Sequence, residues 1–340
     1  MSPASDPVEA EPLPVVDFHS HHVAPGVPAL APVNATDELR RAWRRVAREV
    51  GDVEATLVGM DRLGITRRVL SAPPSMVTPD GTSIAPDVVT ALNDHLAEVV
   101  TAHPDRFAGL ATVDAYAGEG AADTVAAAVA AGFTGIVVDC AHQGVYLDAP
   151  RCRPALAAAA EAGLAVFVHP VSPAALSADL GALGRAGTSL ARGTAVSASL
   201  LALLTTGALD DLPGLRLVFP MLSAAGLHLA AASDPDTRIR ADAPPHERWH
   251  VYVDTMGFAP PAIRFAVDLL GADHVVAGSD WPVPDRPADR RRVTDALTRA
   301  GLTPADRHQI AHRTATTLLT PATPHDAPAA HGEPDRPGRR

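Results

Sequence analysis

Short apolar runs of strand length alternate with longer helical patterns along most of this 340-residue chain. The runs are rich in β-branched or aromatic residues, and the longer segments have the spacing of amphipathic helices. We predict strands at residues 15–18, 67–71, 107–112, 135–139, 165–169, 215–219, 251–254 and 274–279. We predict helices at residues 36–50, 53–63, 85–102, 119–131, 154–162, 188–206, 261–270, 287–300 and 304–318.

Eight strands that alternate with helices indicate parallel, right-handed βα units, and eight such units close into a (β/α)8 TIM barrel of the α/β class. A doubly wound open sheet is the alternative, but no glycine-rich phosphate loop follows the first predicted strand. We expect one barrel over residues 14–320. Residues 1–13 and 321–340 are rich in proline, alanine and charge without periodicity, so we predict two disordered tails.

The charge and composition of the chain argue against several kinds of partner. The net charge is −11 and no long basic run occurs, so neither nucleic acid nor an anionic membrane surface is expected to bind. No stretch approaches the roughly 20 apolar residues of a membrane span. Residues 1–14 do not resemble a secretory signal, and two cysteines, Cys140 and Cys152, are too few for a disulfide framework. We therefore expect a cytoplasmic protein.

In such a barrel the functional side chains lie at the carboxyl ends of the strands. His19 and His21 end the first predicted strand. Residues two apart on a strand point to the same face, here the barrel mouth, where two imidazoles can share one metal ion. The motif alone is a weak signal, because the adjacent His22 makes a solvated histidine cluster an ordinary interpretation.

Two other predicted strands lead to residues of the same kind. His169 ends the fifth strand and Asp280 lies at the end of the eighth. Each alone fits a turn or a cap, but three histidines and a carboxylate at one rim are hard to explain as packing. The set predicts one divalent metal ion per chain, Zn²⁺ by preference with Mn²⁺ or Fe²⁺ as alternatives, and a coordination position left for water or substrate.

Several motifs beside these residues are arranged as in a known family. They are Asp-Phe-His-Ser-His-His at 17–22, Met-Asp-Arg-Leu-Gly-Ile-Thr at 60–66 leading to Leu-Ser-Ala-Pro-Pro at 70–74, Pro-Asp-Arg-Phe-Ala-Gly-Leu-Ala at 104–111, Phe-Val-His-Pro at 167–170, Asp-Leu-Pro-Gly-Leu-Arg-Leu at 211–217 and Gly-Ser-Asp-Trp-Pro at 278–282. Over residues 14–319 the sequence resembles the aminocarboxymuconate-semialdehyde decarboxylase-like branch of the amidohydrolase superfamily.

The resemblance implies a mononuclear site that uses the four residues already singled out, and it suggests a homodimer. The chain contains no lysine, since all 28 of its basic residues are arginine. It therefore cannot form the carboxylated lysine that commonly bridges two metals in the superfamily. Cys140, near the end of the fourth strand, could bridge instead, but a buried and inert thiol is the more ordinary interpretation.

The sequence departs from the family pattern after the sixth strand. Family members usually carry a histidine there that helps to activate water or substrate, and Met221 occupies its place. A thioether cannot transfer protons, and general acid–base groups typically contribute about 10²–10⁴-fold to a rate. Asp254 and His142 are candidate replacements, although Asp254 could instead orient a ligand and His142 could be solvent-exposed. Asp280 could itself relay a proton, whereas His228 is expected to lie too far away.

Other side chains are candidates to contact the substrate or have structural interpretations. Met221 and Trp281 lie next to expected site residues, and Arg44 and Arg48 belong to an arginine-rich helix that could reach a substrate carboxylate, although such a helix is usually a solvated face. Two histidines, His103 and His274, fall at the amino ends of strands and are expected to be surface or turn residues.

Three functions remain open at this stage. The first is a decarboxylase of a small unsaturated or aromatic carboxylic acid, in which a metal stabilises charge as the carbon–carbon bond polarises. The second is a metal-dependent hydrolase of a lactone, ester, amide or carbon–carbon bond, against which Met221 weighs. The third is a noncanonical biosynthetic or binding protein that has lost the usual chemistry, against which the intact ligand set weighs.

Overall fold

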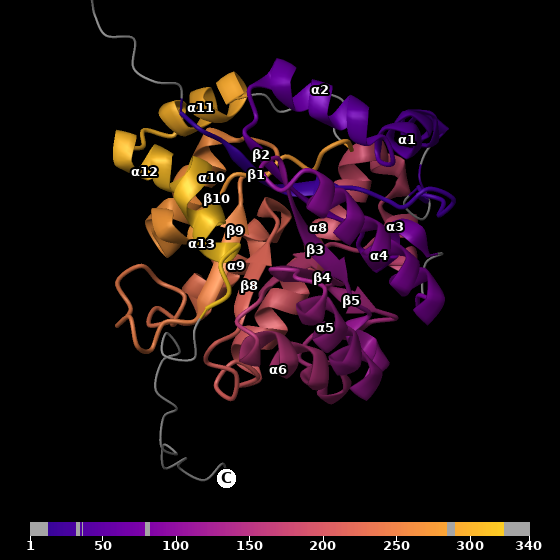
Figure 1. Ribbon diagram of the computed structural model, residues 1–340. Coiled ribbons are helices and arrows are strands. Elements are labelled where there is room, and N and C mark those ends of the chain that lie inside the picture. Colours follow the sequence, from indigo (N-terminus) through magenta and orange to yellow (C-terminus); the bar gives the residue numbers. More distant parts are fainter. Residues whose placement is uncertain (1–12, 32–34, 36, 79–81, 284–289, 323–340) are drawn as a thin grey trace, which may run out of the picture.

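Eight parallel strands pair in the order β1-β2-β3-β4-β7-β8-β9-β10, and helices surround them (Figure 1). This computed structural model describes residues 13–31, 35, 37–78, 82–283 and 290–322. The strands are β1 (Val16–His21), β2 (Arg67–Ser71), β3 (Phe107–Thr112), β4 (Gly135–Asp139), β7 (Ala165–His169), β8 (Arg216–Phe219), β9 (His250–Asp254) and β10 (Val275–Val276). The predicted (β/α)8 barrel is therefore confirmed.

Helices follow the predicted pattern, with additions in the connections between strands. The described helices are α1 (Asp37–Glu49), α2 (Val53–Leu63), α3 (Pro74–Val77), α4 (Pro86–Ala102), α5 (Glu119–Ala130), α6 (Arg153–Glu161), α7 (Ala174–Asp179), α8 (Gly184–Thr205), α9 (Ala224–Ser233), α10 (Pro260–Leu270), α11 (Arg290–Arg299), α12 (Pro304–His308) and α13 (Thr314–Leu318). None of them is long and apolar enough to cross a membrane.

Pairing between the first and last strands closes the barrel. β10 spans only Val275–Val276, so the predicted strand at 274–279 is too long. Asp280 has a positive φ of 63°, which is incompatible with a continued strand. Backbone hydrogen bonds nevertheless continue across the seam, where the N–H of Asp280 donates to the carbonyl oxygen of His19 at 2.8 Å. This contact brings Asp280 to the end of β1.

An apolar cluster fills the inside of the barrel. Phe18 and Phe167 meet there with ring centroids 6.4 Å apart, beside Val16 at the start of β1. α13 adds Ala315 and Leu318 to the same cluster, so this helix covers the amino ends of the strands. The amino end of the barrel is thus occupied by packing, and its carboxyl end is left for the site.

Several elements differ from the prediction because they are too short or too irregular to show periodicity. They include α3, α7 and the hairpin formed by β5 (Ala141–His142) and β6 (Val145–Tyr146). The predicted helix at 304–318 is interrupted by a π-helical turn at Gln309–Arg313. The predicted tails, and the start of the predicted helix at 287–300, lie almost entirely outside the described residues.

The two histidines assigned to the amino end of the barrel are not alike. His103 caps the end of α4. His274 lies in a 3₁₀ turn as expected, but it is buried rather than on the surface. Its Nδ1 donates to the carbonyl oxygen of Val251 at 2.8 Å, and its ring stacks on Tyr252 with centroids 4.4 Å apart. His274 is therefore part of the buried packing beside β9.

Candidate metal centre

The four residues predicted as metal ligands lie together at the carboxyl end of the barrel. His19 and His21 come from β1, His169 from β7, and Asp280 from the segment after β10. One ligand atom of each lies within 4.8 Å of every other. The Oδ1 atom of Asp280 is 3.0 Å from Nε2 of His21 and 3.3 Å from Nε2 of His19. The sequence spacing thus produces one compact donor group.

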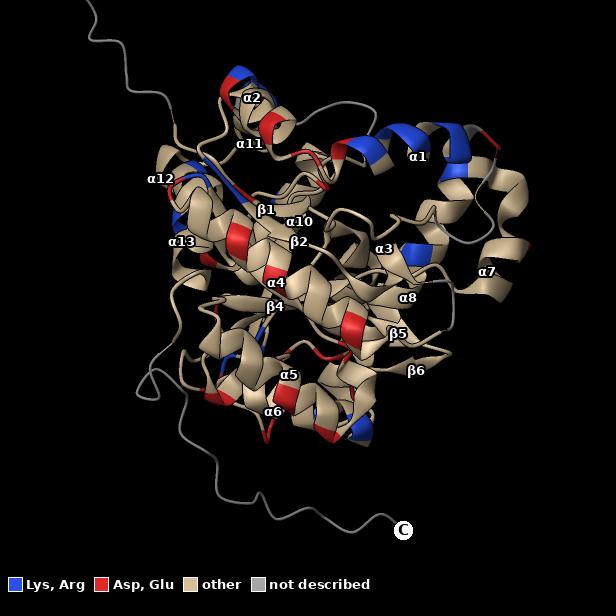
Figure 2. Cartoon of the chain, turned by 45° about the vertical axis from the view of Figure 1, so that its right-hand side comes forward, with Lys and Arg blue, Asp and Glu red and all other residues tan. Residues whose placement is uncertain are grey.

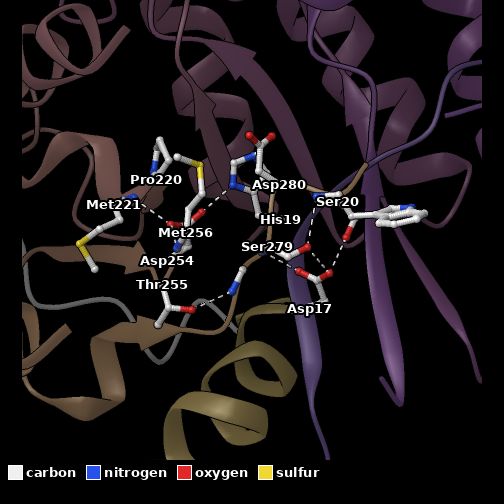
Figure 3. Close-up of polar contacts among 12 residues, drawn as sticks. Asp17, His19, Ser20, Pro220, Met221, Asp254, Thr255, Met256, Ser279 and Asp280 are labelled. Carbon is white, nitrogen blue, oxygen red and sulfur yellow. Dashed lines mark hydrogen bonds and ion pairs between the residues drawn. The ribbon is translucent and has the colours of Figure 1, made fainter. Parts of the chain in front are cut away.

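Asp254, at the end of β9, contacts the Nδ1 side of the His19 ring (Figure 3). Its Oδ2 lies 2.6 Å from Nδ1 of His19, and its Oδ1 accepts the backbone N–H groups of Met221 at 2.8 Å and Met256 at 2.9 Å. Because this carboxylate acts as an acceptor throughout, Nδ1 of His19 is the donor. Nε2 of His19 consequently points towards Asp280, and it could bind a metal ion once it loses its proton.

The donor group fits a cation better than it fits any hydrogen-bonding arrangement of its own. The Nε2 atom of His169 is buried and has no hydrogen-bond partner among the described residues, and Nε2 of His19 has only Asp280, at 3.3 Å. Leaving such an atom unsatisfied costs about 1–3 kcal/mol. Three imidazole nitrogens and one carboxylate oxygen are donors that Zn²⁺ and neighbouring transition metals accept.

The pKa values of the histidines in the donor group also indicate a place for a cation. Burial alone would lower the pKa of His19, but the carboxylates of Asp280 and Asp254 outweigh it and raise this pKa to about 10. Burial lowers the pKa of His21, and burial together with Arg192 lowers that of His169 well below its usual range. The group without metal therefore carries its one positive charge on His19, where a cation would replace a proton.

A buried polar cluster that includes Asp17 of β1 positions Ser279, the residue before Asp280. Asp17 accepts both the backbone N–H of Ser279 at 2.9 Å and its hydroxyl at 2.6 Å (Figure 3). Arg68 lies 3.5 Å from Asp17, and its guanidinium sits 4.4 Å from the ring centroid of Trp281. These contacts fix the chain on both sides of Asp280, whose positive φ needs such support.

A cavity of about 590 Å³ opens beside the donor group, and His169 and Asp280 form part of its wall. Asp139, at the end of β4, lines it too and accepts the hydroxyl of Ser75 at 2.8 Å. Burial raises the pKa of Asp139 to about 7. The sequence reasoning missed Asp139, although its place at the end of a strand is the same signal that identifies His169.

The predicted replacements for the missing histidine differ in position. His142 lies in the cavity wall, on the β5–β6 hairpin, with its ring centroid 5.6 Å from that of Tyr116. Asp254 does not line the cavity, because His19 and two backbone N–H groups occupy its carboxylate. Its contact with Nδ1 of His19 orients the ring of that histidine. His228, on α9, packs near Phe265 of α10 and does not line the cavity either.

The structure does not bring the four candidate substrate contacts to the cavity. Met221 packs into the apolar layer around the barrel and points away from His19 (Figure 3). Trp281 lies against Arg68 instead. Arg44 and Arg48 are exposed on α1, whose basic residues stand out in Figure 2, because the helix turns its apolar face inward.

Cys140 is not part of the donor group. Its thiol is fully buried, and burial raises its pKa to about 12. A neutral buried thiol is neither a metal ligand nor a nucleophile. The inert interpretation of Cys140 thus agrees with its surroundings.

A (β/α)8 barrel with three imidazoles and a carboxylate gathered at its carboxyl end defines a class of metal-binding barrel proteins. The amidohydrolase family model matches residues 16–320, and the chain belongs to this family. The resemblance drawn from the motifs is confirmed.

Relatives of known activity and structure are found within the family. The chain is 27% identical over 259 residues to the gamma-resorcylate decarboxylase of Rhodococcus jostii (strain RHA1), covering 69% of this chain and 78% of the relative. It is 24% identical over 255 residues to the 2-amino-3-carboxymuconate-6-semialdehyde decarboxylase of Dictyostelium discoideum, covering 71% and 70%. The 5-carboxyvanillate decarboxylase of Novosphingobium aromaticivorans, solved with bound manganese, superposes with a TM-score of 0.73 at 19% identity, covering 90% and 97%.

Proposed function

We propose that this protein is a metal-dependent decarboxylase of a small aromatic or unsaturated carboxylic acid. The observation that carries the proposal is the donor group of His19, His21, His169 and Asp280 in the wall of a cavity large enough for such an acid. Both curated relatives are decarboxylases, in agreement with the function predicted from the sequence.

The four residues of the donor group would hold one divalent ion. When bound, the ion would polarise the acid and stabilise negative charge as the carbon–carbon bond weakens. The sequence-based preference for Zn²⁺ stays a prediction, and Mn²⁺ is an equal candidate because a structural neighbour contains it. Asp254 keeps the tautomer of His19 that directs Nε2 towards the ion.

The reaction converts a carboxylate and a proton into CO₂ and a carbon–hydrogen bond. The protein must therefore deliver one proton to the carbon that the CO₂ leaves. Several described residues in the cavity wall can carry or accept a proton, among them Asp280, Asp139 and His142. Asp280 is our first candidate for this relay, because its carboxylate has a second oxygen beyond the one nearest the histidines.

The hydrolase hypothesis has less support than the decarboxylase proposal. It needs a base to activate water, and the position that carries the family histidine holds Met221, which packs into the apolar layer. The binding-protein hypothesis is opposed by the complete donor group, because a protein that had lost its chemistry would not be expected to retain all four donors.

The proposal is tested on the purified full-length protein. Elemental analysis should find about one divalent ion per chain, and a panel of hydroxybenzoic acids should include one that releases CO₂ in stoichiometric amount. His169→Ala should lose both the ion and the activity, whereas the exposed His246→Ala should keep both. Absence of an ion, or hydrolysis of lactones and esters without CO₂ release, would overturn the decarboxylase.

Two further expectations belong to this proposal. The homodimer suggested by the family resemblance is measured by light scattering during size-exclusion chromatography, with a dimer mass as the expected result. A cytoplasmic location, expected from the cysteine content, is measured by fractionating cells that produce the full chain.

A further inference from the structure

A second, smaller chamber adjoins the main cavity at the donor group. It has a volume of about 200 Å³, and Asp280 lies in the wall of both spaces. Trp43, Arg192 and Val283 are the other residues common to both walls. A ligand at Asp280 could therefore extend from the main cavity into this side chamber.

The side chamber is basic, although the protein as a whole carries a net charge of −11. Three arginines line it, Arg185, Arg192 and Arg292, and Asp280 is the one carboxylate among its described lining residues. Part of the remaining wall is apolar, for example Phe258, whose ring lies 5.3 Å from the guanidinium of Arg292. Apolar walls beside arginines suit an organic anion better than a hydrated inorganic ion.

Arg192 is held at the junction of the two spaces by close packing of α8. At the next residue, Gly193, an added Cβ would lie 3.1 Å from the carbonyl oxygen of Leu222, so a larger side chain would require the backbone at Leu222 to shift. Arg192 itself forms no hydrogen bond or ion pair with any residue that the structure describes. A guanidinium carries five N–H donors, so a half-buried arginine of this kind is available to an anion.

The charge of Arg192 reaches the main cavity as well. It contributes, after burial, to the low pKa of His169, and it opposes the effect of burial on the pKa of Asp139. Arg192 thus acts electrostatically on groups near the expected reaction site and still lines the side chamber.

We propose that the side chamber is a second anion subsite, in which Arg192 binds an acidic group of the substrate other than the carboxylate at the donor group. The preferred substrate is then a dicarboxylic acid or an acid with a comparable second anionic group. This inference rests on the proposed function in one respect, since it places the first carboxylate at the donor group.

The first test compares two ligands of nearly the same size in the metal-loaded, full-length protein. Benzene-1,3-dicarboxylate and its monomethyl ester differ in one negative charge, and calorimetry measures the dissociation constant of each. The diacid should bind about tenfold to a hundredfold more tightly, as expected for a charged hydrogen-bonded pair in a partly buried site. Equal affinities would overturn the second subsite.

The second test assigns the preference to Arg192. Arg192→Met should weaken the diacid at least tenfold and the monoester much less, whereas the exposed Arg264→Met should change neither. Equal weakening of both ligands would place Arg192 on the first carboxylate and contradict the proposal. If Arg192→Met does not fold, Arg192→Gln takes its place, and the comparison of the two ligands in the wild type decides independently.

Failure of this proposal is distinguishable from failure of the proposed function. Both ligand tests read binding and need no turnover. If the protein prefers the diacid but releases no CO₂, the proposed decarboxylase function is refuted and the proposed anion subsite is retained. A protein that releases CO₂ from monoacids but shows no preference for the diacid would do the reverse.

Discussion

The Oδ2 atom of Asp254 lies 2.6 Å from Nδ1 of His19, and neither side chain is exposed beyond 1%. The other oxygen of the same carboxylate accepts two backbone N–H groups, so its geometry is fixed from two sides. The ring of His19 is thereby held in the orientation that a metal ligand needs before any metal arrives. Preorganisation of this kind lowers the cost of binding.

Replacing Asp254 should therefore weaken metal binding without removing a ligand. Asp254→Asn keeps an acceptor for the backbone but weakens the contact with His19, so we expect metal affinity to fall about 10–100-fold. Competition with a chromophoric chelator measures this. Asp254→Ala should add a loss of about 1–3 kcal/mol in stability, since the N–H groups of Met221 and Met256 lose their acceptor. Unchanged affinity in Asp254→Asn would contradict an orienting role.

Metal binding should release a proton near neutral pH. In the metal-free protein the pKa of His19 is raised to about 10, so this ring is protonated at pH 7.5 and must lose its proton to bind a cation. Calorimetry in buffers of different ionisation enthalpy should show about one proton released per ion, and affinity should rise about tenfold per pH unit between pH 7 and 9. Affinity independent of pH would contradict a protonated His19.

The same pKa sets the sign of a stability effect in the metal-free protein. The pKa of His19 is higher in the folded state than its ordinary value of 6.5, so the folded state binds the proton more tightly. This contribution to stability is complete below pH 6.5 and is lost as the pH rises towards 10. Denaturant unfolding of the metal-free protein at pH 7 and at pH 10 measures the loss, and His19→Gln should reduce it.

Met221→His should not create a hydrolase. The side chain at this position packs among apolar residues and points away from His19 (Figure 3), so a histidine there would be buried without an assigned partner. We expect a loss of about 1–3 kcal/mol in stability and no gain of lactone or ester hydrolysis. Met221→Leu, which conserves volume, should cost less than about 1.5 kcal/mol. New hydrolase activity in Met221→His would show that the histidine reaches the site.

The buried His274 should make the protein sensitive to acid. Burial lowers its pKa to about 4, so the unfolded state binds its proton more readily between pH 4 and 6.5. Stability from this group is complete above pH 6.5 and is lost as the pH falls towards 4, with a total on the order of 3 kcal/mol. His274→Phe should flatten that part of the unfolding profile relative to the wild type. An identical pH slope in the two proteins would refute the contribution.

The sequence predicts those parts of the site that depend on strand ends. His19, His21 and His169 end strands whose apolar runs are easily seen, and the barrel topology then brings them to one rim. The same rule could have identified Asp139, which ends β4. Strand patterns thus predict which residues reach the mouth of the barrel.

Contacts that depend on loops and helix packing could not be predicted in this way. Arg192 lines both cavities from α8, and the approach of α8 to Leu222 at Gly193 depends on tertiary structure rather than on periodicity. Arg44 and Arg48 illustrate the reverse case. Their charge suggested a role, but the apolar face of α1, with Trp43 buried, turns them to solvent.

The donor group spans the seam between β1 and β10, where the two ends of the barrel meet. His21 and Asp280 lie 259 positions apart in the chain and on opposite sides of the line where the barrel closes. An ion held by both would act as a reversible cross-link between the two ends of the fold, and any binding to the folded state alone adds to its stability. Removing the ion would then free the first and last strands to separate, so a chelator should promote local opening at this seam before the rest of the barrel unfolds.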